Sequence, residues 1–96
     1  MIEKDQIEPI EGEWDESQKL FTGECSIRYP NGERYKGEVE ANVREGFGTY
    51  YYENQDIYEG EWSGGRKQGQ GKMSYANGTV YEGKWKRGKK SGRGKV

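Results

Sequence analysis

The chain has 96 residues, of which 29% are hydrophobic and 34% are charged. This composition excludes a domain with a thick apolar core, because too little apolar surface is present to offset the entropy lost on folding. Histidine is absent and there is one cysteine, which removes the usual catalytic base, the commonest zinc ligand and any internal disulfide. Aromatic residues still make up 14% of the chain, and sixteen glycines recur at regular intervals. We therefore expect order to arise from repetition.

Charge is distributed unevenly along the chain. Residues 1–61 hold sixteen acidic and six basic residues, a net charge of −10, whereas residues 62–96 hold one acidic and ten basic residues, a net charge of +9. The first residues are acidic and lack an apolar stretch, so we do not expect a signal peptide. No segment approaches the roughly 18 apolar residues of a membrane span. These features predict a cytoplasmic protein, and the charge polarity bears on its partners rather than on its fold.

The first third of the chain is expected to hold a loose cap and a degenerate repeat. Residues 1–9 are predicted to be disordered or a loose N-terminal cap. The segment Ile10-Glu-Gly12-Glu-Trp14 opens a degenerate repeat over residues 10–34. The loop of this repeat carries two more residues than the loops of the later copies.

Three clearer repeats follow over residues 35–57, 58–80 and 81–96, with a period of 23 residues. The last copy stops within its second expected strand, which fits either a fragment of a longer array or an array with a truncated final hairpin. The positions that the copies share are mostly aromatic or glycine: Tyr35, Tyr58 and Tyr81; Gly37, Gly60 and Gly83; Val39, Trp62 and Trp85; Gly46, Gly69 and Gly92; Gly48, Gly71 and Gly94; Tyr52 and Tyr75.

Each repeat is predicted to form a β-hairpin. Residues 58–62 and 69–75 alternate apolar or small residues with polar ones, which indicates strands. A polar turn separates the two segments, and Asn-Gly pairs at Asn31 and Asn77 mark tight turns between repeats. No segment has a helical pattern. We therefore predict an all-β fold of tandem β-hairpin repeats that form one elongated, twisted, single-layer antiparallel sheet.

Strand alternation sorts the side chains onto two faces. Glycines on one face leave gaps into which tyrosine and tryptophan rings of neighbouring strands can lie, so these residues are interpreted as scaffold. The polar face is expected to carry Glu59, Glu61, Gln70, Lys72 and Ser74, with its glutamates solvated. The aromatic face is expected to carry Tyr58, Gly60, Trp62, Gly69, Gly71, Met73 and Tyr75.

The unit Tyr-x-Gly-x-Trp-x-x-Gly-x-x-x-Gly-x-Gly resembles the MORN repeat (membrane occupation and recognition nexus). Residues 58–72 are a near-ideal copy of this unit, and residues 81–95 are another. Two departures occur in the N-terminal copies: Val39 stands where the motif has tryptophan, and Cys25 stands where the motif has its last glycine. We expect Cys25 to be buried rather than reactive.

The resemblance implies a non-catalytic interaction module without cofactors, acting as a protein–protein scaffold near the cytoskeleton or a membrane. Its alternatives are a module that tethers to anionic phospholipids (phosphoinositides), or an accessory N-terminal segment of a phosphatidylinositol phosphate kinase or a SET-domain enzyme. Rival repeats fit less well. Leucine-rich repeats require more than the single Leu20, and choline-binding cell-wall repeats have a different tryptophan spacing.

Three binding modes follow from the residues. An apolar patch of Phe47, Tyr51, Ile57 and Val80 on the polar face predicts a protein interface. A basic segment predicts contact with anionic lipid, although its residues are divided between the polar face and a loop. The lipid-contact candidates are Lys84, Lys86, Arg87, Lys89, Lys90, Arg93 and Lys95.

The third mode is self-association through the edge strand expected at residues 92–96, since exposed strand edges pair readily. Charge favours head-to-tail pairing of the acidic and basic ends, whereas family resemblance favours head-to-head pairing. Nucleic acid is a weaker candidate, because no recognition helix or continuous stacking platform is expected.

Overall fold

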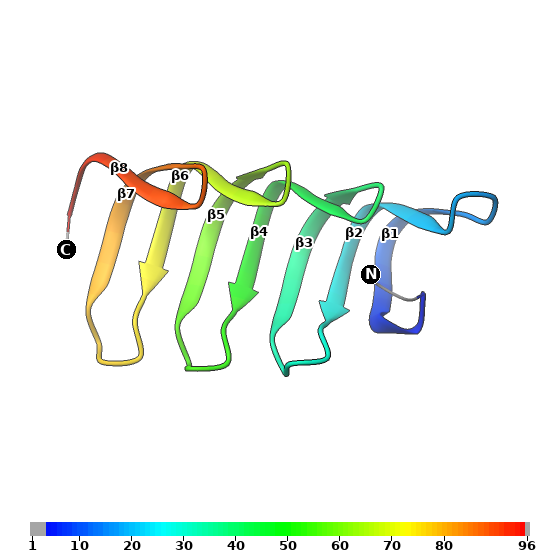
Figure 1. Cartoon of the computed structure of the whole chain (residues 1–96), viewed down its shortest axis with the longest axis horizontal. Helices are drawn as coiled ribbons and strands as arrows, with labels where there is room; N and C mark the ends of the chain where they lie inside the picture. Colours follow the sequence, from blue (N-terminus) through cyan, green and yellow to red (C-terminus); the bar gives the residue numbers. More distant parts are fainter. Residues whose placement is uncertain (1–3, 96) are drawn as a thin grey trace.

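The computed structural model describes residues 4–95, with side chains from Asp5 to Ser91, and shows a single eight-stranded antiparallel sheet (Figure 1). Every strand pairs with its neighbours in sequence, so four hairpins succeed one another along a body of 44 × 23 × 20 Å. The predicted all-β fold of tandem hairpins in one elongated sheet is confirmed. The strands are β1 (Ile7–Asp15), β2 (Leu20–Arg28), β3 (Arg34–Glu40), β4 (Val43–Tyr51), β5 (Ile57–Ser63), β6 (Arg66–Ser74), β7 (Val80–Lys86) and β8 (Lys89–Lys95).

The first strand begins closer to the N-terminus than the expected boundary between the cap and the first repeat. A single turn of 3-10 helix, η1 (Lys4–Gln6), leads directly into β1, so residues 7–9 belong to the sheet. Ile7 pairs with Ile27 of β2, and both side chains are buried. Burial of two isoleucines therefore orders a segment whose acidic composition had suggested a loose cap.

The turns within the hairpins have the backbone that their residues favour. Asn42, Gly65 and Gly88 all have positive φ, as predicted for this position of the repeat, and so do the residues that precede them. Two consecutive positive φ values match the twist of a tight two-residue hairpin turn. In the first hairpin Asp15 pairs with Leu20, so four residues form its turn. The two-residue insertion expected there is confirmed.

The loops between repeats are built on a left-handed residue at the Asn-Gly pairs. Gly32 and Gly78 have φ values of 91° and 93°, and their amides donate to the carbonyls of Tyr29 and Tyr75 at 3.0 and 2.9 Å. The corresponding loop after β4 has Gln55 at this position, with φ of 81°. Glycine accepts such a backbone without steric cost, which explains why two of the three loops use it.

The predicted aromatic face is the buried face of the sheet. Tyr58, Trp62 and Met73 are buried, whereas Glu59, Glu61 and Lys72 on the same strands are exposed. Tyr75 is only partly buried, because it lies at the margin of the core. The buried core is Ile7, Phe21, Cys25, Ile27, Tyr35, Val39, Tyr50, Tyr58, Trp62, Met73, Tyr81 and Trp85.

Tyrosine and tryptophan rings form a continuous chain along this face. Trp62 packs edge-to-face between Tyr35 and Tyr58, with ring centroids 5.5 and 5.2 Å apart. Trp85 packs in the same way between Tyr58 and Tyr81, at 5.3 and 5.4 Å. Each tryptophan thus joins the tyrosines of two successive repeats in a geometry that aromatic quadrupoles favour.

Glycines make room for these rings. A Cβ at Gly71 would overlap the hydroxyl and ring of Tyr58, and a Cβ at Gly48 would overlap Tyr35. The indole Nε1 of Trp85 donates to the carbonyl of Gly71 at 3.3 Å, so the glycine contacts rings of two repeats. The predicted packing of rings over glycine gaps is therefore confirmed at Gly48 and Gly71, but not at Gly69, where a Cβ would meet the carboxylate of Glu61 instead of a ring.

The two departures from the motif occur together, at positions that contact one another in the later repeats. Cys25 occupies the repeat position that Gly48 and Gly71 occupy 23 and 46 residues later. β1 contains no tyrosine whose ring could lie over this position. Trp62 bonds the carbonyl of Gly48, whereas Val39, the residue 23 positions earlier, has no indole to reach Cys25. The first hairpin instead buries Ile7, Phe21 and Ile27 beside Cys25, which is buried as expected.

Replacing Gly71 with alanine tests the gaps between the rings. The backbone at Gly71 is not left-handed, so the cost of Gly71→Ala is the steric overlap with Tyr58. We expect a loss of about 1–3 kcal/mol of unfolding free energy, measured by thermal and denaturant unfolding. Ser74→Ala, on the opposite face of the same strand, is the matched control and should cost less than about 0.5 kcal/mol. Equal melting of the two variants would contradict the packing.

Alkaline pH tests tyrosine burial. Burial raises the pKa of Tyr29, Tyr35, Tyr50, Tyr52 and Tyr58 above the usual value of 10.0. Because the folded state favours the neutral phenol, stability from these groups is complete below pH 10 and falls as the pH rises beyond it. We expect phenolate absorbance to appear together with the change in tryptophan fluorescence on unfolding. If all eight tyrosines ionise while the tryptophan fluorescence remains that of the folded protein, the tyrosines are not buried as described.

Candidate interaction surfaces

Three of the four residues of the predicted apolar patch lie in one row across the polar face. Tyr51 is the register partner of Ile57, Ile57 of Ser74, and Ser74 of Val80. The row crosses β4 to β7 near the loops between repeats, at the lower end of the strands in Figure 1. We name Tyr51, Ile57 and Val80 the apolar strip. All three side chains are partly exposed.

The row continues beyond the apolar strip into basic residues. Tyr51 is the register partner of Arg34, which in turn is the partner of Arg28 on β2. The guanidinium of Arg34 lies 5.0 Å from the ring centre of Tyr51. Sequence reasoning missed both arginines, because they lie on strands of successive hairpins and only the register aligns them.

Phe47 lies apart from the apolar strip. Its register partner is Glu61, and it stands four residues from Tyr51 along β4. With 63% of its surface exposed, it is the most exposed large hydrophobic residue of the described part of the chain. The predicted patch is thus two separate surfaces, because four residues of extended strand separate its members by roughly 13 Å.

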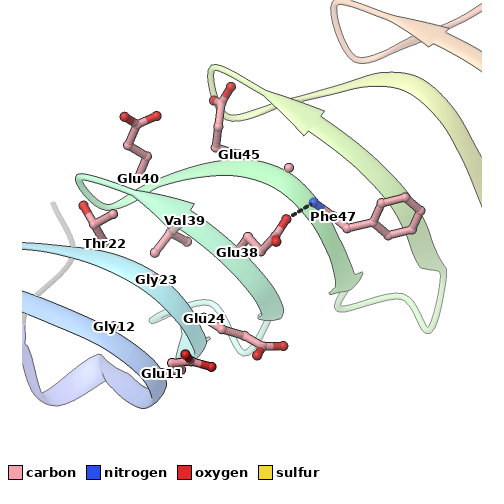
Figure 2. A pocket seen from close by; sticks show the side chains of 11 residues that line it. Glu11, Gly12, Thr22, Gly23, Glu24, Glu38, Val39, Glu40, Glu45 and Phe47 are labelled. Atoms are coloured by element: carbon pink, nitrogen blue, oxygen red, sulfur yellow. Dashed lines mark hydrogen bonds between the residues drawn. The ribbon is translucent and has the colours of Figure 1, made fainter.

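A broad acidic hollow of about 680 Å³ borders Phe47 (Figure 2). It crosses β1 to β4, and the ring of Phe47 points away from the carboxylates that line it. Register places Glu11 opposite Glu24, and Glu24 opposite Glu38. Like charges directly opposite one another are unfavourable, so this part of the sheet repels anions.

Two glutamates on this face are structural rather than merely solvated, which corrects the expectation from sequence. The carboxylate of Glu38 accepts the amide of Phe47 at 2.6 Å, and that of Glu61 accepts the amide of Gln70 at 2.5 Å. Both bonds lie where the register of the hairpin shifts. Bulges leave backbone amides without a strand partner, and the carboxylates satisfy them. The fourth repeat has Lys84 at this position, which cannot accept such a bond.

The basic residues of the last repeat divide between two places. Lys86, Arg87, Lys89 and Lys90 line a hollow of about 540 Å³ together with Arg66, which the sequence analysis did not include. Lys84 instead lies on the polar face, with Gln70 as its register partner. The side chains of Arg93 and Lys95 lie outside the described part of the structure.

Three cations lie against the aromatic face at intervals of 23 residues. Arg44 lies 4.8 Å from the ring centre of Trp62, and Lys67 lies at the same distance from that of Trp85. Lys90, predicted as a lipid contact, lies 4.9 Å from the ring of Tyr81. Cation–π attraction holds these side chains, and burial lowers the pKa of Lys67. Their role is in packing between repeats, which the sequence analysis missed.

Neither a membrane-spanning helix nor a metal site emerges from the described residues. No helix there is both long and apolar enough to cross a membrane. No group of three or more metal-ligating side chains gathers within the same residues.

Comparison with known families identifies the fold. The family model described as MORN repeat matches residues 35–57, 58–80 and 81–96, which is more than half of the chain. The chain therefore belongs to the MORN repeat family, as its motif indicated. No curated protein sequence matches it. Repeats of this family generally serve as modules for interaction with proteins or lipids.

Proposed function

We propose that this chain is a non-catalytic protein–protein scaffold whose partner binds the polar face along the apolar strip. The observation that carries the proposal is the register that aligns Tyr51, Ile57 and Val80 across four strands. The neighbouring row on the same face carries Glu59, Lys72 and Glu82, so the apolar row is bordered by charged residues. Apolar patches rimmed by polar residues commonly mark protein interfaces.

The ring packing explains why this face is free for binding. Stability of the sheet comes from the opposite face, where the buried rings lie. Replacement of an outward-facing side chain therefore leaves the core intact. This separation of the core from the binding face suits a scaffold, because residues that recognise a partner can change while the fold stays stable.

The double variant Ile57→Ser with Val80→Ser tests the proposal. Each truncated contact of this size contributes on the order of 1 kcal/mol to binding, so we expect at least about a tenfold loss of affinity for captured partner proteins. Quantitative affinity capture with the full chain measures this. The matched control is Glu59→Ser with Glu82→Ser, on the same strands and the same face but one row away. If both double variants retain the same amount of partner protein, the strip has no role in binding.

We propose anionic lipid as a second ligand class, because Lys86, Arg87, Lys89 and Arg66 converge on one hollow. A basic residue near an anionic leaflet contributes about 1 kcal/mol, so four acting together suffice for measurable binding. These basic residues lie at the opposite end of the sheet from the acidic hollow, which also favours binding of an anionic lipid.

Vesicle sedimentation tests this second ligand. We expect salt-sensitive binding to phosphatidylcholine vesicles that contain phosphatidylinositol bisphosphate, and at least about a tenfold loss for Lys86→Gln with Arg87→Gln and Lys89→Gln. Lys72→Gln is the control, since Lys72 is exposed but lies outside the hollow. No sedimentation at low salt would exclude the lipid role.

A further inference from the structure

The apolar strip ends in a compact basic pocket on β2 and β3. The pocket has a volume of about 330 Å³, and its polar lining includes Ser26, Arg28, Arg34 and Lys36, with Glu8 as the only carboxylate that the described residues contribute. It differs from the basic hollow of the last repeat, which lies on β6 to β8. Residues 1–61 contain only six basic residues, and three of them meet in this pocket.

The two arginines of this pocket face one another, and among the described residues no ion pair joins either of them to a carboxylate. Arg28 and Arg34 are direct register partners, an arrangement that costs energy unless an anion lies between them. Arg28 donates to the backbone carbonyl of Asp5 at 3.2 Å, which uses one of its five N–H groups. Within the described residues, neither Arg34 nor Lys36 forms an ion pair with a carboxylate. The pocket thus presents unused donors to a ligand.

The charge and geometry of these donors match a phosphate monoester. Three cations and one carboxylate leave a local charge of +2, and a phosphorylated side chain carries about −1.5 to −2 at neutral pH. The Tyr51 ring holds the guanidinium of Arg34 in place, which prepares it for bidentate contact with phosphate oxygens. The hydroxyl of Ser26 adds a further donor.

We propose that this pocket binds a phosphorylated side chain of an extended partner segment whose following residues lie on the apolar strip. The inference rests on the proposed scaffold function and adds the chemistry of the partner. A peptide fits better than an anionic membrane, because the row beside the strip carries two carboxylates against one cation, Lys72, and a flat surface would reach the acidic hollow as well. Glu59 and Glu82 border the strip, and the acidic hollow adjoins the same half of the sheet. A flat anionic surface would contact all of these carboxylates.

The spacing of the row predicts the pattern of the partner. Neighbouring strands lie ~4.8 Å apart, so Tyr51, Ile57 and Val80 lie ~7, ~12 and ~22 Å from the midpoint between Arg28 and Arg34. An extended peptide advances ~3.4 Å per residue. Apolar residues at the second, fourth and sixth positions after the phosphorylated residue, at ~7, ~14 and ~20 Å, would therefore meet the strip.

A peptide in which phosphoserine is followed by Gly-Val-Gly-Val-Gly-Val tests the proposal. We expect the full chain to bind it at least about tenfold more tightly than both the unphosphorylated peptide and inorganic phosphate, by fluorescence anisotropy and competition. Backbone amide resonances of Ser26, Arg34, Tyr51 and Ile57 should shift in the NMR spectrum on titration. Affinity should fall as the pH drops below about 6, where the phosphate gains a proton.

Variants separate the pocket from the strip. Arg34→Gln should abolish the preference for the phosphorylated peptide, whereas Arg66→Gln, an exposed arginine outside the pocket, should retain it. Ile57→Ser with Val80→Ser should weaken both peptides and leave the preference intact. Thermal unfolding confirms that each variant is folded.

Three outcomes overturn the inference. They are equal affinity for the two peptides, affinity no greater than that for inorganic phosphate, and sedimentation with phosphatidylserine vesicles that depends on Arg34. If the phosphopeptide does not bind but the strip variant still binds protein partners more weakly, the phosphate pocket is refuted and the scaffold proposal stands. If the strip variant binds both the partner proteins and the peptide as tightly as the original chain does, the scaffold proposal itself is refuted.

Discussion

The fold depends on one repeated contact, in which a tyrosine ring lies over a glycine of the adjoining strand while a tryptophan of the next repeat closes against its edge. Gly71 lies beneath Tyr58, and Trp85 packs edge-to-face on Tyr58 at 5.3 Å. A single hairpin cannot bury such rings alone, so each repeat obtains its core from its neighbour. This dependence explains how a chain with so few apolar residues forms an ordered sheet.

The same contact lets one face of the sheet supply the buried core, so the opposite face has few structural constraints. The buried rings and the cations that lie on them, such as Arg44 and Lys67, occupy one side. On the other side, outward residues are constrained only where a bulge requires an acceptor, as at Glu38 and Glu61. Residues elsewhere on that face can differ between repeats without loss of stability. Recognition is therefore expected where the repeats differ from one another rather than where they agree.

Differences between repeats gather into distinct surfaces. Carboxylates opposite one another form the acidic hollow over β1 to β4, and basic residues converge at the β7–β8 end. Between these ends, a single row passes from paired arginines through Tyr51 to Ile57 and Val80. A partner that follows this row would contact strands of all four hairpins at once, which suits the elongated shape of the molecule.

The sequence by itself determined the period, the hairpins, the identity of the buried face and the membership of the family. These properties are local: strand alternation and turn residues such as Gly32 and Gly78 act within one repeat, and the copies confirm one another. Only the tertiary structure decided which outward residues meet. Register aligns Tyr51 with Ile57 but leaves Phe47 apart, and it sets Arg28 against Arg34. The members of each pair lie on strands of successive hairpins, so their proximity depends on where the bulges and loops set the register, a property of neighbouring strands together.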